Sequence, residues 1–217
     1  MGSFCGFSSE MFDFLLALHD NNTVGAQNEN IVLYKKLITL PLTDLYETLL
    51  PTMIAISDAI ETSPHRSISS PYTDRRFSPL IPLKEYMYLR FKVGGREKDI
   101  PGFYFDMGGE FFSYGIRIYK QTSAGMENLR AKWLANTEKY LPIVERISEQ
   151  GFLVFGDIFV KDHAPHLQNS VLKTLVNHKN FYIGKKVPIT DLVYSAALSD
   201  RLVKEYLILR EFFLMLL

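Results

Sequence analysis

The segment 71–78 combines a phenol, a carboxylate, two guanidinium groups and a hydroxyl within eight residues. An Arg guanidinium binds phosphate or carboxylate through two parallel hydrogen bonds, and a neighbouring Asp can hold one Arg in position. These residue types therefore predict a binding site for an anionic small molecule, with no catalytic residue assigned. The candidate ligand-binding residues are Tyr72, Asp74, Arg76 and Ser78, to which Lys84 and Arg90 add positive charge.

The same segment has a structural interpretation. An Asp74–Arg76 pair can simply fix the loop at the entrance to the next strand, and loops with polar clusters serve both purposes. The large rings of Tyr72 and Phe77 predict a loop that is docked on the fold, because such rings are usually buried. Both interpretations stay open from the sequence.

Charge is distributed unevenly along the 217 residues. The chain has 24 Lys and Arg against 24 Asp and Glu, but residues 1–63 sum to −6, residues 64–98 to +5 and residues 99–217 to +1. The basic segment contains the candidate site, although it can also pair with the acidic helices. A neutral chain without a basic stripe argues against nucleic-acid binding, so we expect no nucleic-acid partner.

Other chemistries have weak sequence support. His163 and His166, near Asp157 and Asp162, lack the i, i+4 spacing of helical zinc ligands, and Pro165 lies between them. We interpret this stretch as a polar connecting loop and expect no metal. Phosphate loops, dinucleotide glycine motifs and nucleophile elbows are missing from the sequence, so we also expect no cofactor.

The single cysteine, Cys5, permits no intrachain disulfide, and no apolar run approaches the roughly 20 residues of a membrane span. We expect a cytoplasmic protein without a membrane partner. The apolar helix expected at the end of the chain, about 199–217, could dock on a second copy, so a homo-oligomer is possible.

Periodicity predicts a single α+β domain over residues 1–217. Helices are expected after a Ser8 or Ser9 cap, over 29–39 with an end at Pro41, from Thr43 with a kink or break at Pro51, and over 124–141 followed by a short helix at Pro142. Alternating residues and glycine turns predict an antiparallel meander at about 86–93, 102–106 and 110–119. We expect a mainly antiparallel central sheet with N-terminal and C-terminal helices packed on it.

Several short motifs, taken in order, resemble the uncharacterised conserved-hypothetical family known as domain of unknown function 2461. The pattern Tyr72-x-Asp74-x-Arg76-Phe77-Ser78 is similar to the signature of that family. Further similar stretches are Gly6-Phe7-Ser8, Pro101-Gly102-Phe103-Tyr104-Phe105, Tyr114-Gly115-Ile116, Leu129-Arg130 and Lys179-Asn180-Phe181-Tyr182. The resemblance spans nearly the whole chain but implies no particular reaction.

The chain departs from the family pattern at three places. Thr73 replaces an Arg, Pro79-Leu80-Ile81-Pro82 replaces a Lys-rich stretch, and Thr23-Val24-Gly25-Ala26 stands where Trp-Phe is expected. Two hypotheses follow. The first is a small-molecule-binding protein or enzyme that uses the Tyr72, Asp74 and Arg76 loop. The second is a non-catalytic interaction or scaffold module.

Overall fold

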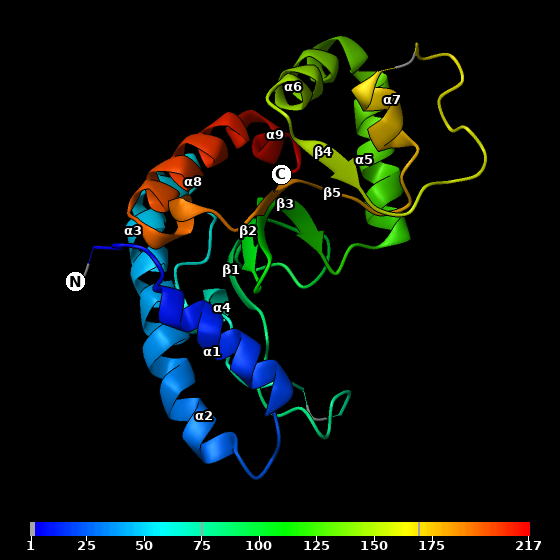
Figure 1. Cartoon of the computed structure of the whole chain (residues 1–217). Helices are drawn as coiled ribbons and strands as arrows, with labels where there is room; N and C mark the ends of the chain where they lie inside the picture. The colour runs from blue at the N-terminus through cyan, green and yellow to red at the C-terminus, as the bar shows by residue number, and fades with distance from the viewer. Residues whose placement is uncertain (1–2, 75, 169) are drawn as a thin grey trace. The chain divides into compact units, whose positions relative to one another are not determined.

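The computed structural model describes residues 3–74, 76–168 and 170–217, and Figure 1 labels its elements. The helices are α1 (Ser9–Asp20), α2 (Gln27–Tyr34), α3 (Leu40–Ile56), α4 (Pro64–Ser67), α5 (Ser123–Ala135), α6 (Thr137–Glu149), α7 (Val171–Val176), α8 (Ala197–Ile208) and α9 (Arg210–Met215). The strands are β1 (Met87–Lys92), β2 (Ile100–Met107), β3 (Phe111–Tyr119), β4 (Leu153–Phe155) and β5 (Tyr182–Pro188).

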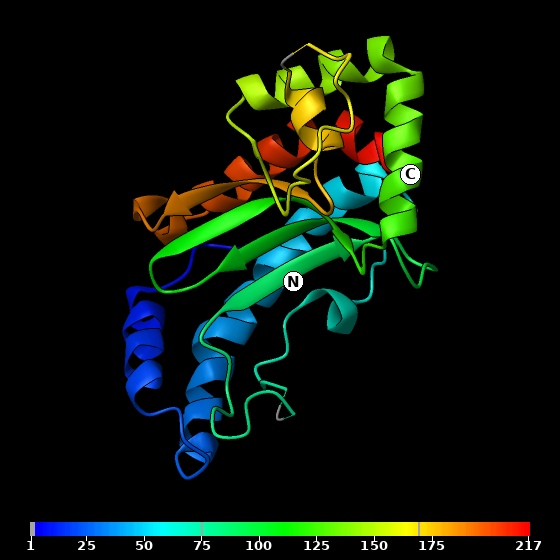
Figure 2. The same ribbon diagram turned by 90° about the vertical axis from the view of Figure 1, so that its right-hand side faces the viewer.

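The five strands form one antiparallel sheet in the order β1-β2-β3-β5-β4, which confirms the predicted meander of β1, β2 and β3 (Figure 2). Along β1, buried and half-buried residues alternate because successive side chains point to opposite faces of a sheet. Met87, Leu89 and Phe91 are buried, whereas Tyr88 and Arg90 lie on the opposite face. Helices pack around the sheet, and the predicted α+β class is confirmed.

The chain divides into two compact units, and β1, β2, β3 and β5 contribute residues to both. The first unit comprises the described part of Met1–Phe91 with Phe105–Ser113 and Lys186–Lys204. The second comprises Lys92–Tyr104, Tyr114–Lys185 and Glu205–Leu217. The single domain expected from the length stays a prediction.

In the first unit, α1 begins where expected, because the Ser8 hydroxyl accepts a hydrogen bond from the Met11 N–H. The ring of Tyr46 in α3 stacks on Phe91 of β1, with centroids 5.4 Å apart, and this contact packs α3 on the sheet. Gly6 has a φ of +112°, and a Cβ there would lie 2.3 Å from the Tyr194 carbonyl carbon. Glycine is therefore required where the chain enters α1.

In the second unit, the C-terminal helices cover apolar rings. Phe213 stacks on Phe103 of β2 at 4.7 Å, and Phe181 lies 5.7 Å from the Trp133 ring of α5. The buried Tyr206 hydroxyl donates to the Tyr104 carbonyl at 2.9 Å. The apolar side chains of the C-terminal helices, from which docking of a second copy was expected, are largely buried, and a homo-oligomer stays a prediction.

Two expectations about prolines, a helix end at Pro41 and a helix start at Pro142, are wrong, and of the kink or break expected at Pro51 the break is absent. Pro41 does not end a helix: the π-helical turn Lys35–Thr39 leads into α3, and Pro41 lies in its first turn, where no N–H is needed. Pro51 does not break α3, because Leu49 and Met53 on either side of it are fully buried and this packing outweighs one lost hydrogen bond. Pro142 lies inside α6, which begins at Thr137 directly after α5 ends.

Among the described residues, every helix is too short or too polar to cross a membrane.

Candidate functional site

The predicted site loop forms an irregular hairpin that leads into β1. Tyr72 forms a β-bridge with Leu83, flanked by hydrogen bonds from the Thr73 N–H to the Pro82 carbonyl at 3.0 Å and from the Lys84 N–H to the Pro71 carbonyl at 2.8 Å. The base of the hairpin therefore pairs Tyr72 with Leu83, and the Lys84 backbone with that of Pro71. Asp74, Arg76 and Ser78 lie toward its tip.

At the tip, Asp74 and Arg76 bind each other. The Arg76 Nε and Nη2 donate to the Asp74 carboxylate at 2.9 and 2.6 Å, and this contact lowers the pKa of Asp74. The Phe77 and Ser78 N–H groups donate to the Asp74 carbonyl, which closes the turn. Both charged side chains are exposed, so the pair fixes the loop in solvent and the Arg76 charge is already compensated.

The expectation of a docked loop is wrong for its two rings. Phe77 is 82% exposed and Tyr72 is 45% exposed. Phe77 lies against the Arg76 guanidinium, 5.8 Å from ring centroid to Cζ. Backbone hydrogen bonds across the hairpin, and not burial of aromatic side chains, therefore define the conformation of this loop.

Lys84 and Arg90 meet at one aromatic ring. The Arg90 Cζ lies 3.7 Å and the Lys84 Nζ 5.1 Å from the centroid of Tyr88. Both cations are half-buried. Burial, and then the nearby Arg90 charge, lower the pKa of Lys84. The Lys84 ammonium donates to the Ser70 carbonyl at 2.8 Å, and no carboxylate pairs with it in the part of the chain that the structure describes.

Sequence reasoning missed three tyrosines at this place. Tyr86 lies 6.3 Å from Tyr88, centroid to centroid, on the same face of the strand. The Tyr34 hydroxyl of α2 is buried and has no hydrogen-bond partner among the described residues. Burial raises the pKa of Tyr34, and the neighbouring phenols of Tyr86 and Tyr88 raise it further. The alternation Tyr86-x-Tyr88-x-Arg90 was the signal in the sequence. We call Tyr34, Lys84, Tyr86, Tyr88 and Arg90 the β1 cluster.

The β1 cluster can bind an anion. A half-buried ammonium without a carboxylate favours a negatively charged ligand, and an unsatisfied buried phenol favours a hydrogen-bond acceptor. Of the six predicted site residues, the structure therefore brings Lys84 and Arg90 together, and it pairs Tyr72 with Leu83 at the base of the hairpin. It places Asp74, Arg76 and Ser78 in a separate turn.

The His163 region is a hydrogen-bonded loop of the second unit. Asp162 pairs with Lys173 at 2.9 Å, and the His163 N–H donates to the Asn177 side chain at 2.7 Å. Residues 3–74, 76–168 and 170–217 contain no group of three or more His, Cys, Asp or Glu side chains that could hold a metal ion.

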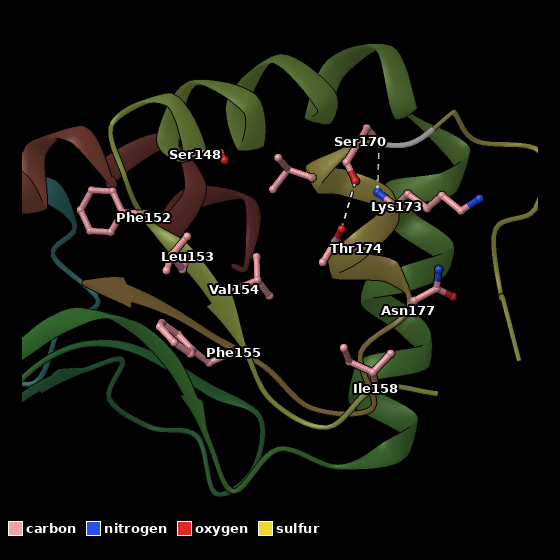
Figure 3. A pocket seen from close by; sticks show the side chains of 11 residues that line it. Ser148, Phe152, Leu153, Val154, Phe155, Ile158, Ser170, Lys173, Thr174 and Asn177 are labelled. Atoms are coloured by element: carbon pink, nitrogen blue, oxygen red, sulfur yellow. Dashed lines mark hydrogen bonds between the residues drawn. The ribbon is translucent and has the colours of Figure 1, made fainter. Parts of the chain in front are cut away.

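A groove of about 750 Å³ also lies in the second unit, between the end of α6, β4 and α7 (Figure 3). Its walls are mainly apolar, and the Ser170 and Thr174 side chains are hydrogen-bonded within α7 and its cap. None of the predicted site residues lines it. The lining residues are Ser148, Phe152, Leu153, Val154, Phe155, Ile158, Ser170, Val171, Lys173, Thr174 and Asn177.

Comparison with known proteins identifies a family. No curated protein matches the chain. The model of a family described as conserved hypothetical protein (DUF2461) matches residues 10–214, nearly the whole chain and all of the β1 cluster. The chain therefore belongs to the DUF2461 family of conserved hypothetical proteins.

Proposed function

We propose that this protein binds an anionic small molecule at the β1 cluster. The observation that carries the proposal is the placement of the Lys84 ammonium and the Arg90 guanidinium at the same ring, Tyr88. The half-buried Lys84 ammonium has no carboxylate partner among the described residues and lies near the Arg90 charge, so an anion bound beside it lowers the free energy of the protein. The proposal keeps the ligand class predicted from the sequence and moves the site from the hairpin tip to its base.

The ligand is a phosphate or carboxylate compound, because Arg and Lys together recognise either group. The Tyr34 hydroxyl supplies a hydrogen-bond donor from α2. No reaction is assigned, since the cluster contains no carboxylate that could act as a general base or acid. We propose binding and not catalysis. A cytoplasmic location belongs to the proposal and rests on the free, exposed thiol of Cys5.

A thermal-shift screen against phosphates, nucleotides and carboxylates tests the proposal. At least one compound should raise the melting temperature of the wild type, and Arg90→Met should abolish that increase. Arg66→Met is the matched control, because Arg66 pairs with Glu61 elsewhere in the same unit. A screen without any stabilising compound, or a shift equal in wild type and Arg90→Met, contradicts the proposal.

One observation favours the alternative of a non-catalytic interaction module. Phe77 and Leu80 at the hairpin tip are 82% and 77% exposed. Exposed apolar side chains at a loop tip suit contact with a second copy of the chain. Under this alternative, light scattering detects a dimer that the double variant Phe77→Ser, Leu80→Ser converts to monomer. A wild-type monomer excludes it.

A further inference from the structure

Arg117 of β3, in the second unit, is surrounded by tyrosine rings. Its Cζ lies 5.0 Å from the centroid of Tyr104, 5.2 Å from Tyr182 and 5.9 Å from Tyr119. Arg117 and Tyr119 alternate with Ile116 and Ile118, so they share one face of the strand. Cation–π attraction from several rings stabilises a half-buried guanidinium in this position.

The N–H groups of Arg117 donate no hydrogen bond to another described residue, and its guanidinium forms no ion pair with one. Half-buried guanidinium groups usually have a carboxylate partner, because an uncompensated charge is costly to bury. Here ring faces take the place of that partner, and they leave the planar fork of N–H donors available to a ligand.

A pocket of about 280 Å³ adjoins this guanidinium. It contains two cations, Arg117 and Lys120, and no carboxylate lines it. Two acids next to the lining residues are already hydrogen-bonded: Asp157 accepts from the Asn180 side chain at 2.8 Å, and Asp99 accepts from the Thr122 N–H at 2.6 Å and from the Thr122 hydroxyl at 2.8 Å. The lining residues are Arg117, Ile118, Tyr119, Lys120, Gln121, Asn180, Phe181 and Tyr182.

The amide oxygens that line the pocket already accept hydrogen bonds from the protein backbone. Gln121 Oε1 accepts from the Phe181 N–H at 3.0 Å, and Asn180 Oδ1 accepts from the Asp157 N–H at 3.3 Å. The groups left for a ligand are therefore the two cations and the aromatic walls. This set recognises charge and an apolar ring, and it offers few contacts to a neutral polar compound.

We infer that this pocket binds a small molecule that contains a phosphomonoester next to an aromatic ring. The phosphate accepts two hydrogen bonds from the Arg117 fork, and Lys120 supplies the second positive charge. A phosphomonoester has a charge of about −1.5 to −2 near pH 7, which matches two cations better than a single carboxylate does. The ring of the ligand lies against the half-buried Tyr182. The site is independent of the β1 cluster and shares no residue with it.

Calorimetric titration of the full chain in phosphate-free buffer tests the inference. The probes are phenyl phosphate, inorganic phosphate and benzoate, which separate the ring from the dianion. Phenyl phosphate should bind most tightly, and Arg117→Met should weaken it at least tenfold. Arg210→Met is the control, because Arg210 is an exposed arginine of the same unit and does not line this pocket.

Two further measurements keep the test decisive if Arg117→Met folds poorly. Arg117→Lys retains the charge and the ring contacts but lacks the fork, and it should also bind phenyl phosphate more weakly than the wild type. In the wild type, the Arg117 Nε–H resonance should shift on titration with phenyl phosphate. Absence of saturable phenyl phosphate binding overturns the inference. So does binding that Lys84→Met abolishes and Arg117→Met leaves intact, an outcome that instead supports the β1 cluster.

Discussion

The guanidinium of Arg90 lies on the ring of Tyr88, 3.7 Å from Cζ to centroid, two residues apart on the half-exposed face of β1. Lys84 approaches the same ring from the base of the hairpin at 5.1 Å. A strand places residues i and i+2 on one face, so this juxtaposition follows directly from the alternation Tyr88-x-Arg90. The proposed anion site depends on it.

The Tyr34 hydroxyl gives the first prediction. Because it is buried without a partner among the described residues, Tyr34→Phe should leave the free energy of unfolding unchanged or raise it by up to about 1 kcal/mol. Tyr46→Phe is the matched control, since the Tyr46 hydroxyl donates to the Thr62 carbonyl at 2.6 Å and its removal should cost about 1 kcal/mol. Urea denaturation measures both. A larger loss for Tyr34→Phe than for Tyr46→Phe would show that the Tyr34 hydroxyl is satisfied.

Arg130 should be structural and not part of a ligand site. Its side chain is buried and donates to the carbonyls of Val176 at 2.8 Å and His178 at 3.1 Å. Arg130→Met removes both hydrogen bonds and should lower the free energy of unfolding by about 2–4 kcal/mol. Arg210→Met, at an exposed position, should change it by less than about 0.5 kcal/mol. Equal urea midpoints for the two variants would contradict this role.

His19 should titrate above its ordinary pKa. Its Nδ1 lies 2.8 Å from the Glu85 carboxylate, and this hydrogen bond raises the pKa of His19 above 6.5. The folded state therefore favours protonated His19, so the stabilisation is complete below pH 6.5 and is lost as the pH rises through the folded-state pKa. NMR titration of the imidazole measures it. Glu85→Gln should lower the pKa of His19, and an unchanged value in that variant is the contrary result.

Asp162 should behave in the opposite sense. Lys173 above all, with the Ala164 N–H and Asn177, lowers the pKa of Asp162 to about 2. The folded state favours the carboxylate, so the stabilisation is complete above pH 3.8 and declines as the pH falls toward 2. Carboxyl-carbon NMR should show the pKa of Asp162 rising in Lys173→Met. A pKa that stays near 2 in that variant would assign the shift to the backbone and Asn177 alone.

Local patterns predicted the secondary structure well where periodicity was strong. The alternation of β1 and the Ser8 cap each depend on neighbouring residues, and the structure confirms them. The expectations of a helix end at Pro41 and a break at Pro51 failed because tertiary packing decided the outcome. Pro51 costs α3 a hydrogen bond, but burial of Leu49 and Met53 is worth more.

The candidate site was only partly predictable for a related reason. Asp74 and Arg76 are adjacent in sequence and pair locally, and this pairing removes Arg76 from the available cations. Tyr34 is 50 residues or more from Lys84 and Arg90 in the sequence, and nothing in its own surroundings indicates that it joins them. Such long-range neighbours require the fold, whereas the contact of Arg90 with Tyr88 could be predicted from the alternation of one strand.

The most direct test of the β1 cluster compares Lys84→Met with Arg76→Met. Each variant loses one cation from the same hairpin, one at its base and one at its tip. Calorimetric titration with the compound that stabilises the wild type most should show binding weakened at least tenfold in Lys84→Met and unchanged in Arg76→Met. Binding that is lost in Arg76→Met and retained in Lys84→Met would contradict the account.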